Sequence, residues 1–278
     1  MNWRDFQTMQ RVAEIDEGFV SYLDDGAGEP VILIHGIPTW GYLWHQLIPE
    51  LVKTNRVLAP DLIGFGYSDK SDRFDRSIAR QAELINDWMD TIAVQRAHIV
   101  AHDIGGGVAL RLATLFPKRV MSLCVMNTVC YDSWPIEAML QFGHPETRTK
   151  LSAATAMSLL KRALKQGFAS SVDDYLIEGL LAPYTTEVGK LSLIRNAAAL
   201  NTNLTTEITS LLPKINVPTL VIWGEDDEFQ LLKYAQRLVS DIPNAVLVRV
   251  KDARHFVMLD RPGEVAGHVS HFLTQELH

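Results

Sequence analysis

Short apolar runs alternate with segments of helical periodicity through the first half of the chain. Each run ends at a glycine, a proline or a polar turn, which is typical of strands buried on both faces of a sheet. The expected strands are residues 19–23, 31–35, 57–59, 97–101 and 120–126. Ser77 is placed to cap a helix that runs to about Ile92, because the apolar residues that follow it keep helical spacing. A second helix is expected over residues 108–116, where Pro117 ends it.

The pattern changes after residue 130. Residues 131–212 contain no convincing strand signal and favour helical segments that are broken at residues 143–145, Gly167 and Pro183. These breaks are glycines and prolines, which end helices. The sequence therefore predicts a helical insertion in the middle of the chain.

Strand and helix signals alternate again near the end of the chain. The expected elements are strands at residues 219–223 and 246–250 and helices at residues 231–240 and 263–276. We expect an α/β core of residues 1–130 and 213–278, with residues 131–212 forming a helical lid. An open parallel sheet carries its chemistry at the carboxyl ends of its strands, so the loops there are the place to look for a site.

Composition narrows the class of protein. A chain of 278 residues with 47% hydrophobic and 21% charged residues is ordinary for a globular protein, and it can bury about three-quarters of its unfolded surface. The formal net charge of −7 argues against nucleic acid or an anionic membrane as a partner, and no apolar stretch is long enough to span a bilayer. Residues 1–18 are rich in charge where a signal peptide would be apolar, so a cytoplasmic location is expected. Cys124 and Cys130 flank an apolar run and are expected to be buried thiols outside any disulfide framework.

Residues 98–106 carry the most informative motif. A strand leads through a sharp turn into a helix opened by glycines, which matches the nucleophile elbow G-x-S-x-G. Ala101 occupies the first glycine position, and Asp103 stands where serine would be. The helix N-terminus behind Asp103 favours its ionised form. The structural alternative is an aspartate that caps the helix.

Three motifs in this order resemble the α/β-hydrolase superfamily, and specifically its aspartate-nucleophile branch of haloalkane dehalogenases, epoxide hydrolases and fluoroacetate dehalogenases. Residues 35–44 resemble the oxyanion loop of the haloalkane dehalogenases, and residues 59–70 resemble the loop after their next strand. Residues 102–105 are similar to the nucleophile motif of the whole branch. The resemblance implies an α/β-hydrolase fold, with a mostly parallel eight-stranded sheet flanked by helices and an inserted helical lid.

A carboxylate nucleophile needs a base to activate water, and the base needs an acid to orient it. His255 follows the last expected strand, where the superfamily keeps its histidine. The family pattern W-G-x-x-D at residues 223–227 selects Asp227 as the acid. The expected triad is therefore Asp103 as nucleophile, His255 as general base and Asp227 as the acid that orients the histidine.

Other carboxylates could supply the acid. Glu225 and Asp226 lie in the same acidic loop, which could also be a solvated surface. Some members of the branch place the acid after the preceding core strand. That position falls near Asn127, which cannot serve as an acid, and Asp132 a little further on is a second candidate.

The oxyanion site is expected to consist of two main-chain N–H groups, those of Ile37 and Ile104. Both side chains are apolar, so the contribution would come from the main chain alone. His35 and His102 adjoin these loops and are expected to support the site through hydrogen bonds without taking part in catalysis.

A carboxylate nucleophile limits the chemistry. Its attack on a saturated carbon yields an alkyl ester that activated water can hydrolyse, whereas its attack on an ordinary ester would yield a high-energy anhydride. Asp103 therefore points to an epoxide, a carbon–halogen bond or a strained lactone.

The leaving group depends on the groups that stabilise it. The haloalkane dehalogenases commonly hold halide with a Trp after the nucleophile and, in many members, an Asn after His-Gly, and this chain has Ile104 and Ile37 there. The fluoroacetate dehalogenases have an Arg after the nucleophile, which is also absent. Epoxide hydrolases use lid donors, often tyrosines. The lid candidates are Tyr184 first and Tyr175 second, with Tyr131 and His144 also present in the insertion.

The leading hypothesis is a cofactor-free epoxide hydrolase that acts on a small apolar substrate and water. The alternatives are a haloalkane or haloacid dehalogenase, a strained-lactone hydrolase, or a ligand-binding protein that uses the same fold without catalysis. The sequence has no dinucleotide fingerprint, P-loop or Cys/His metal spacing, so neither a cofactor nor a metal is expected. It leaves a homo-oligomer open.

Overall fold

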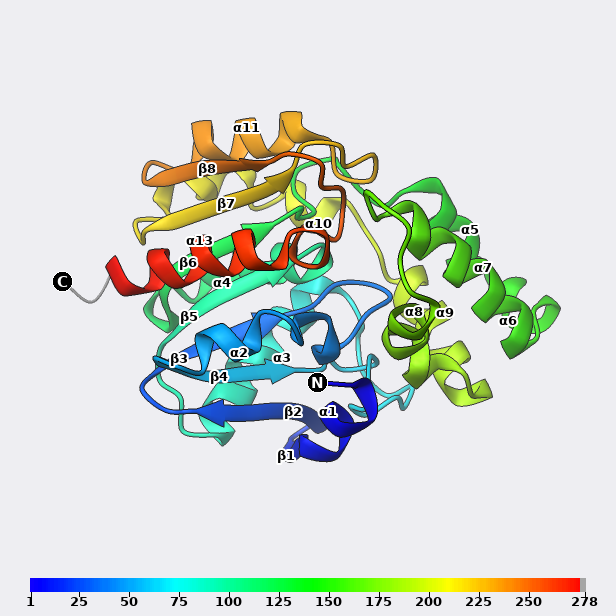
Figure 1. The fold of residues 1–278 in the computed structure, drawn as a ribbon. Coiled ribbons are helices and arrows are strands. Elements are labelled where there is room, and N and C mark those ends of the chain that lie inside the picture. Colours follow the sequence, from blue (N-terminus) through cyan, green and yellow to red (C-terminus); the bar gives the residue numbers. More distant parts are fainter. Residues whose placement is uncertain (276–278) are drawn as a thin grey trace.

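A single eight-stranded sheet organises the computed structural model, which describes residues 1–275 (Figure 1). The strand order is β1-β2-β4-β3-β5-β6-β7-β8. The first two pairings, β1 with β2 and β2 with β4, are antiparallel, and all the others are parallel. The expected α/β fold with a mostly parallel sheet of eight strands is confirmed.

The strands are β1 (Arg11–Ile15), β2 (Gly18–Gly26), β3 (Glu29–Ile34), β4 (Asn55–Pro60), β5 (Ala97–His102), β6 (Val120–Met126), β7 (Thr219–Gly224) and β8 (Ala245–Val250). The α-helices are α1 (Trp3–Met9), α2 (Ile48–Leu51), α3 (Ile78–Thr91), α4 (Ile104–Leu115), α5 (Glu137–Gly143), α6 (Thr147–Lys150), α7 (Ala153–Gln166), α8 (Asp174–Leu181), α9 (Glu187–Ala198), α10 (Asn203–Thr206), α11 (Leu232–Asp241), α12 (Val257–Asp260) and α13 (Pro262–Gln275). Short 3₁₀ turns are η1 (Gly41–Trp44), η2 (Pro117–Arg119), η3 (Ala182–Tyr184) and η4 (Thr209–Lys214).

Local sequence explains most of these bounds. Ser77 caps α3 by accepting a hydrogen bond from the Arg80 main-chain N–H. The four central strands β3 to β6 are almost entirely buried, which accounts for their continuous apolar composition. Cys124 and Cys130 are free and buried, as expected. The last residue of the helix expected at 263–276 lies outside the described residues.

The amino-terminal elements α1 and β1 were not expected from the sequence. Asn2 caps α1, accepting hydrogen bonds from the N–H groups of Arg4 and Asp5. In β1 only Ala13 is buried, because this edge strand pairs with β2 alone and needs no apolar face. The strand therefore gives no hydrophobic signal.

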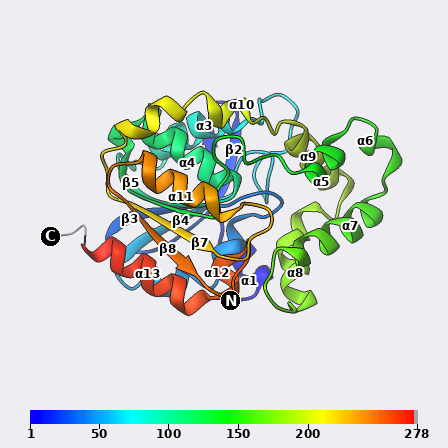
Figure 2. The same cartoon turned by 90° about the horizontal axis from the view of Figure 1, so that it is seen from above.

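Helices cover both faces of the sheet. Figure 2 shows α3 and α4 on one face and α13 on the other. The segment between β6 and β7 contains α5 to α10 and no strand, and α5 to α9 lie beyond one end of the sheet (Figures 1 and 2). None of the helices in residues 1–275 has the length and apolar composition needed to cross a bilayer.

Arg76 ties α9 to the core. Its guanidinium group donates to Ser192 Oγ at 2.7 Å and to Asn196 Oδ1 at 2.6 Å. Both partners in turn donate to the main-chain oxygen of Gly64. Gly64 has φ +86°, and a Cβ there would lie 2.4 Å from Arg76 Nη1, so this crossing requires glycine.

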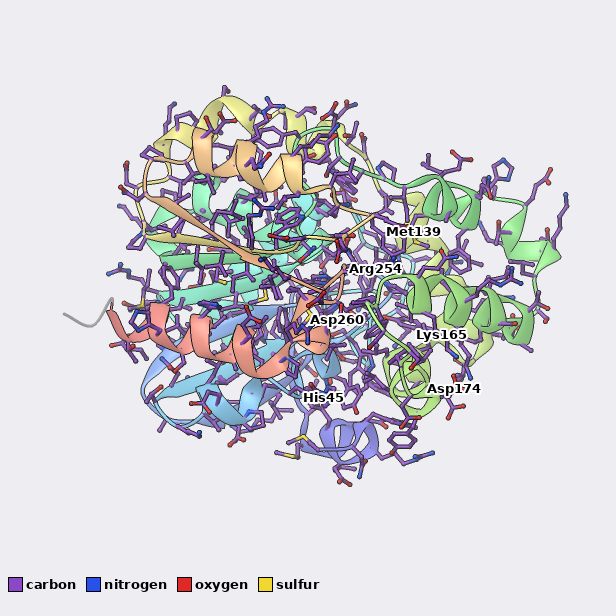
Figure 3. The ribbon with its side chains drawn as sticks, turned by 45° about the horizontal axis from the view of Figure 1, so that its top comes forward. His45, Met139, Lys165, Asp174, Arg254 and Asp260 are labelled. Atoms are coloured by element: carbon purple, nitrogen blue, oxygen red, sulfur yellow. The ribbon has the colours of Figure 1, made fainter. Side chains whose placement is uncertain are left out.

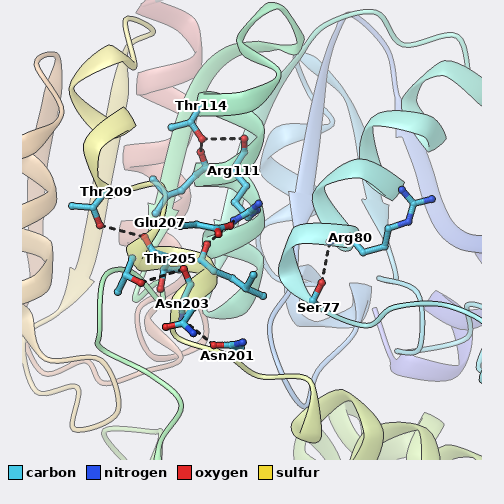
Figure 4. A network of polar contacts seen from close by, with 12 residues as sticks. Ser77, Arg80, Arg111, Thr114, Asn201, Asn203, Thr205, Glu207 and Thr209 are labelled. Atoms are coloured by element: carbon cyan, nitrogen blue, oxygen red, sulfur yellow. Dashed lines mark hydrogen bonds and ion pairs between the residues drawn. The ribbon is translucent and has the colours of Figure 1, made fainter.

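A second tie fixes the return of the inserted segment to α4, the helix behind the nucleophile turn. Arg111 of α4 pairs with Glu207, directly after α10 (Figure 4). The two side chains are 2.5 Å apart. Arg111 also donates to the Leu204 main-chain oxygen at 2.7 Å. Helix α9 and the return of the segment to the core are thus held against the same core that carries the site.

Replacing Arg76 with leucine should destabilise the fold strongly. The side chain is only 5% exposed, and its loss removes a donor from Asn196 Oδ1 and from Ser192 Oγ, both on buried residues. We expect Arg76→Leu to lower the free energy of unfolding in urea by about 2–4 kcal/mol. The matched control is Arg73→Leu, because the Arg73 side chain is 63% exposed and pairs with Asp69 on the surface. This variant should lower the free energy of unfolding by at most about 1 kcal/mol. Equal effects of the two variants would contradict this role of Arg76.

Candidate active site

Asp103 lies in a strained turn between β5 and α4. Its φ is 54° and its ψ is −125°, a conformation that non-glycine residues rarely adopt. Glycines make the turn possible: a Cβ at Gly36 would lie 2.4 Å from Asp103 Cβ, and one at Gly105 would lie 2.4 Å from the main-chain oxygen of Ile34. The Asp103 side chain makes no capping hydrogen bond to α4. Helix capping, which was the structural alternative for Asp103, is therefore not the role of this side chain.

The two carboxylate oxygens of Asp103 face different groups. Oδ1 accepts a hydrogen bond from the Ile37 main-chain N–H at 2.9 Å. The Ile104 N–H lies near enough to the carboxyl group to lower its pKa. Oδ2 lies 3.7 Å from His255 Nε2. The residue is 6% exposed. The main-chain groups predicted to form the oxyanion site thus converge on the carboxylate itself.

The structure brings His255 and Asp227 together with Asp103. His255 Nδ1 lies 3.0 Å from Asp227 Oδ2, and both residues are buried. Asp227 Oδ1 accepts from the Phe229 main-chain N–H at 2.7 Å. An acid–histidine–acid chain therefore runs across the ends of β7, β8 and β5.

Asn127 holds the acid in place, a role that the sequence did not reveal. Its Nδ2 donates to Asp227 Oδ2 at 2.7 Å, while its Oδ1 accepts from the Gly224 N–H at 3.1 Å. Asn127 follows β6 at the same edge of the sheet. This position at a strand end was the only feature of the sequence that could have pointed to its role. It occupies the position that other members of the branch use for the acid and supports Asp227 from there.

The other candidate acids lie elsewhere. Glu225 pairs with Arg249 at 2.8 Å. Asp226 and Asp132 are exposed. None of these three carboxylates contacts His255 in the described structure.

Burial and charge set the ionisation of the site. Burial raises the pKa of Asp103 above its usual range, against the lowering effect of the His255 charge and of the N–H groups of Ile104 and Ile37. Burial by itself lowers the pKa of His255, but the charge and hydrogen bond of Asp227 and the charge of Asp103 together raise it above the ordinary histidine value. The charge on each group thus favours the ionised form of the other, while burial opposes the ionised form of both.

The two neighbouring histidines bond to the main chain. His35 Nε2 accepts from the Leu62 N–H at 2.9 Å, and its Nδ1 lies 2.9 Å from the Gly36 oxygen. Burial lowers the pKa of His102 far below its usual value, so this side chain is neutral. Its Nε2 can then donate to the main-chain oxygen of His255 at 2.9 Å and fix the backbone of that residue.

An apolar cavity opens in front of Asp103 and His255. It has a volume of about 80 Å³ and is lined by the loops after β3, β5, β6, β7 and β8 together with α5 and α7. Figure 3 shows Met139 of α5 and Arg254 of the loop after β8 at the junction between these helices and the core. Residues 1–275 contain no group of three or more His, Cys, Asp or Glu side chains that could hold a metal ion. The cavity suits a compact apolar molecule.

The expected lid donors do not line this cavity, and this part of the prediction is wrong. Tyr184 is fully buried, and its hydroxyl donates to the Thr39 oxygen at 2.8 Å and accepts from the Gly66 N–H at 3.1 Å. Tyr175 is 41% exposed, with its hydroxyl 3.5 Å from Arg4. A tyrosine hydroxyl can be satisfied by a loop or by solvent as readily as by a substrate.

Trp134 does line the cavity, but its indole N–H is already used. It donates to Thr205 Oγ1 at 2.7 Å. At the two positions where dehalogenases commonly carry halide-binding side chains, Ile37 and Ile104 are apolar, and the Ile37 N–H already bonds Asp103. The described cavity therefore lacks the usual side-chain halide donors.

A sequence model of the family described as alpha/beta hydrolase fold matches residues 29–262. The chain belongs to the α/β-hydrolase family. It is 27% identical over 281 residues to the cis-3-alkyl-4-alkyloxetan-2-one decarboxylase of Shewanella oneidensis, covering 91% of this chain and 85% of that protein. It is 30% identical over 263 residues to the haloalkane dehalogenase of Mycobacterium marinum, covering 88% and 85%.

Structural comparison agrees with the sequence relatives. The crystal structure of an α/β-hydrolase fold protein from Burkholderia ambifaria matches with a TM-score of 0.89 at 27% identity, covering 94% of this chain and 97% of that one. The protein is therefore an enzyme of the dehalogenase-like branch of the α/β-hydrolases.

Neutralising Asp103 should lower the pKa of His255. The Asp103→Asn variant keeps the size of the side chain but removes a negative charge near His255 Nε2, so the imidazolium loses part of its stabilisation. The pKa can be followed by NMR on the His255 Hε1–Cε1 signal, assigned by its loss in His255→Gln. Asp226→Asn removes an exposed carboxylate of the same loop as Asp227 and should leave the pKa unchanged. An unchanged or higher pKa in Asp103→Asn would rule out this electrostatic coupling.

Proposed function

We propose that this α/β-hydrolase hydrolyses a small apolar electrophile through a covalent alkyl ester on Asp103. The observation that carries the proposal is the unequal surroundings of the two Asp103 oxygens. The Ile37 main-chain N–H bonds Oδ1, while Oδ2 lies on the side of His255. Oδ1 is thus already in an oxyanion site, and Oδ2 is the oxygen free to attack.

In the first step Oδ2 attacks a saturated carbon of the substrate and the bond to the leaving group breaks, its electron pair departing with that group. The Asp103 carboxylate becomes a neutral ester whose carbonyl oxygen is Oδ1. In this scheme His255 starts as the imidazolium, and an oxygen leaving group then receives its proton through water. His255 is left neutral.

In the second step neutral His255 takes a proton from water, and the resulting hydroxide attacks Cγ of Asp103. Negative charge develops on Oδ1, where the N–H groups of Ile37 and Ile104 stabilise it. The alcohol leaves with a proton from His255, and the carboxylic acid of Asp103 then returns its own proton to His255. Asp227 keeps the imidazole in the orientation and tautomer that these transfers require.

We favour an epoxide as the substrate class. The lack of side-chain halide donors argues against a free halide, since a halide ion needs converging N–H groups in an apolar cavity. Ring strain assists an epoxide, and its leaving oxygen stays bonded to the product. Residues 131–212 would act as the lid that closes this cavity, with residues 1–130 and 213–278 as the catalytic core.

A strained lactone is the second candidate. It is favoured by the similarity to the Shewanella protein, whose name specifies an oxetan-2-one. Its leaving group is a carboxylate, a weak base that needs less stabilisation than an alkoxide. A haloalkane, as in the name of the Mycobacterium relative, is the remaining alternative.

Trapping the ester tests the proposal. In His255→Gln the second step lacks its base, and an oxygen leaving group must take its proton from water in the first. The adduct on the Asp103 peptide should therefore form more slowly but accumulate, and mass spectrometry can detect it. An epoxide or lactone would add its whole mass, whereas a haloalkane would add its alkyl group alone. In wild-type enzyme, a single turnover in ¹⁸O-water should leave label in the Asp103 carboxylate, and Asp103→Asn should lower turnover at least about 1000-fold.

The control is the double variant Asp103→Asn/His255→Gln, which should form no adduct. Turnover of a substrate without either a trapped adduct or ¹⁸O in Asp103 would refute the covalent mechanism.

A further inference from the structure

Gln230 is a polar residue that lines the apolar cavity and that the triad does not use. It follows Asp227 by three residues, in the loop after β7. Its main-chain oxygen accepts the indole N–H of Trp223 at 2.8 Å, which fixes the backbone of the loop. The neighbouring Phe229 ring meets the His255 ring edge to face, with centroids 5.3 Å apart. The loop therefore holds both the acid of the triad and a carboxamide on the cavity wall.

The carboxamide is buried with hydrogen-bonding capacity to spare. Gln230 is 2% exposed, and its Oε1 has no hydrogen-bond partner among the described residues. Buried polar atoms are nearly always paired in proteins, because an unpaired one has lost its water without compensation. Gln230 thus combines a place in the cavity lining with a buried carboxamide oxygen that lacks a partner. We read this unused capacity as available to a molecule that fills the cavity.

The other polar side chains on the cavity wall are accounted for. Asp103 and His255 belong to the triad, and the Trp134 N–H is donated to Thr205. Gln166 is exposed at the end of α7, so water can satisfy it. Among the described lining residues, Gln230 is the buried side chain left to recognise a polar atom of the substrate.

We propose that the Gln230 carboxamide binds the ring oxygen that leaves when Asp103 attacks, so that the substrate carries an oxygen leaving group. This inference rests on the proposed function. The Nε2–H group donates to the oxygen as it gains charge, and Oε1 accepts the hydroxyl hydrogen once that oxygen is protonated. Half a turn about the last side-chain torsion exchanges the two atoms, so either can face the oxygen.

The carboxamide fits an oxygen better than a halide. A hydroxyl both donates and accepts, and so satisfies Nε2 and Oε1 together. A halide only accepts, which would leave Oε1 buried and unpaired beside a negative ion. Gln230 would thus supply the donor that Tyr184 and Tyr175 do not provide, from the loop of the acid instead of from the lid.

The bond changes balance within this scheme. The Oδ2–carbon bond forms, the carbon–oxygen bond of the ring breaks, and the electron pair stays on the ring oxygen. That oxygen takes its proton through water from His255. Gln230 contributes hydrogen bonds and neither gains nor loses a proton.

The test compares two leaving groups on one carbon skeleton. In the His255→Gln background, the rate at which Asp103 becomes alkylated is followed by mass spectrometry with 1,2-epoxyhexane and with 1-chlorohexane. Adding Gln230→Met, which keeps the length of the side chain without its polar atoms, should slow alkylation by the epoxide about tenfold or more. Any alkylation by the chloride should change by no more than about twofold.

Gln236→Met, the same replacement on the exposed surface of α11, is the matched control and should change neither rate. The ratio of epoxide to chloride rates in one sample does not depend on the folded fraction. Gln230→Leu replaces Gln230→Met if circular dichroism shows that the latter does not fold.

The outcomes separate this inference from the function on which it rests. An adduct on Asp103 whose rate with the epoxide is the same with and without Gln230 overturns the role of Gln230 and leaves the covalent mechanism standing. Adducts from the chloride alone also overturn it. Absence of any adduct on Asp103, with every substrate that the wild-type enzyme turns over, removes the proposed function itself.

Discussion

The hydrogen bond from the Ile37 N–H to Asp103 Oδ1 is the contact on which the arrangement of the site depends. It joins the loop after β3 to the turn after β5, two neighbouring parallel strands, at 2.9 Å. Because it occupies Oδ1, the carboxylate has one orientation and Oδ2 is left toward His255. The strained backbone of Asp103 and the close approach of Gly36 are what bring the two loops within this distance.

The buried charged groups of the site fix the positions of its side chains more than they stabilise the fold. Two carboxylates and an imidazolium lose much of their hydration when buried, and their mutual attraction offsets this loss only where hydrogen bonds complete the arrangement. Asp227 receives that completion from Asn127, Phe229 and His255. The acid is thereby held as an acceptor toward His255, and Asn127 serves as a positioning residue where a relative could carry the acid itself.

Residues whose surroundings are set by the end of a strand could be predicted from the sequence. Asp103, His255 and Asp227 each lie within five residues of the carboxyl end of a strand, so the parallel sheet brings them to one edge whatever the lid does. Tyr184 failed because its partners, Thr39 and Gly66, belong to core loops far away in sequence. Gln230 had no signal at all, since an unpaired buried oxygen is a property of tertiary packing. Edge strand β1 lacked the apolar alternation that identifies a strand.

The charge of Asp103 links the two halves of the proposed cycle. While it is present, it helps keep His255 protonated, and the histidine can supply the proton that an oxygen leaving group requires. Once the ester forms, that negative charge is gone, so burial acts on His255 with less opposition and favours the neutral imidazole needed to activate water. Formation of the intermediate thus converts the same histidine from proton source to base. A halide would need no proton, so this exchange is matched to a leaving group that ends as a hydroxyl.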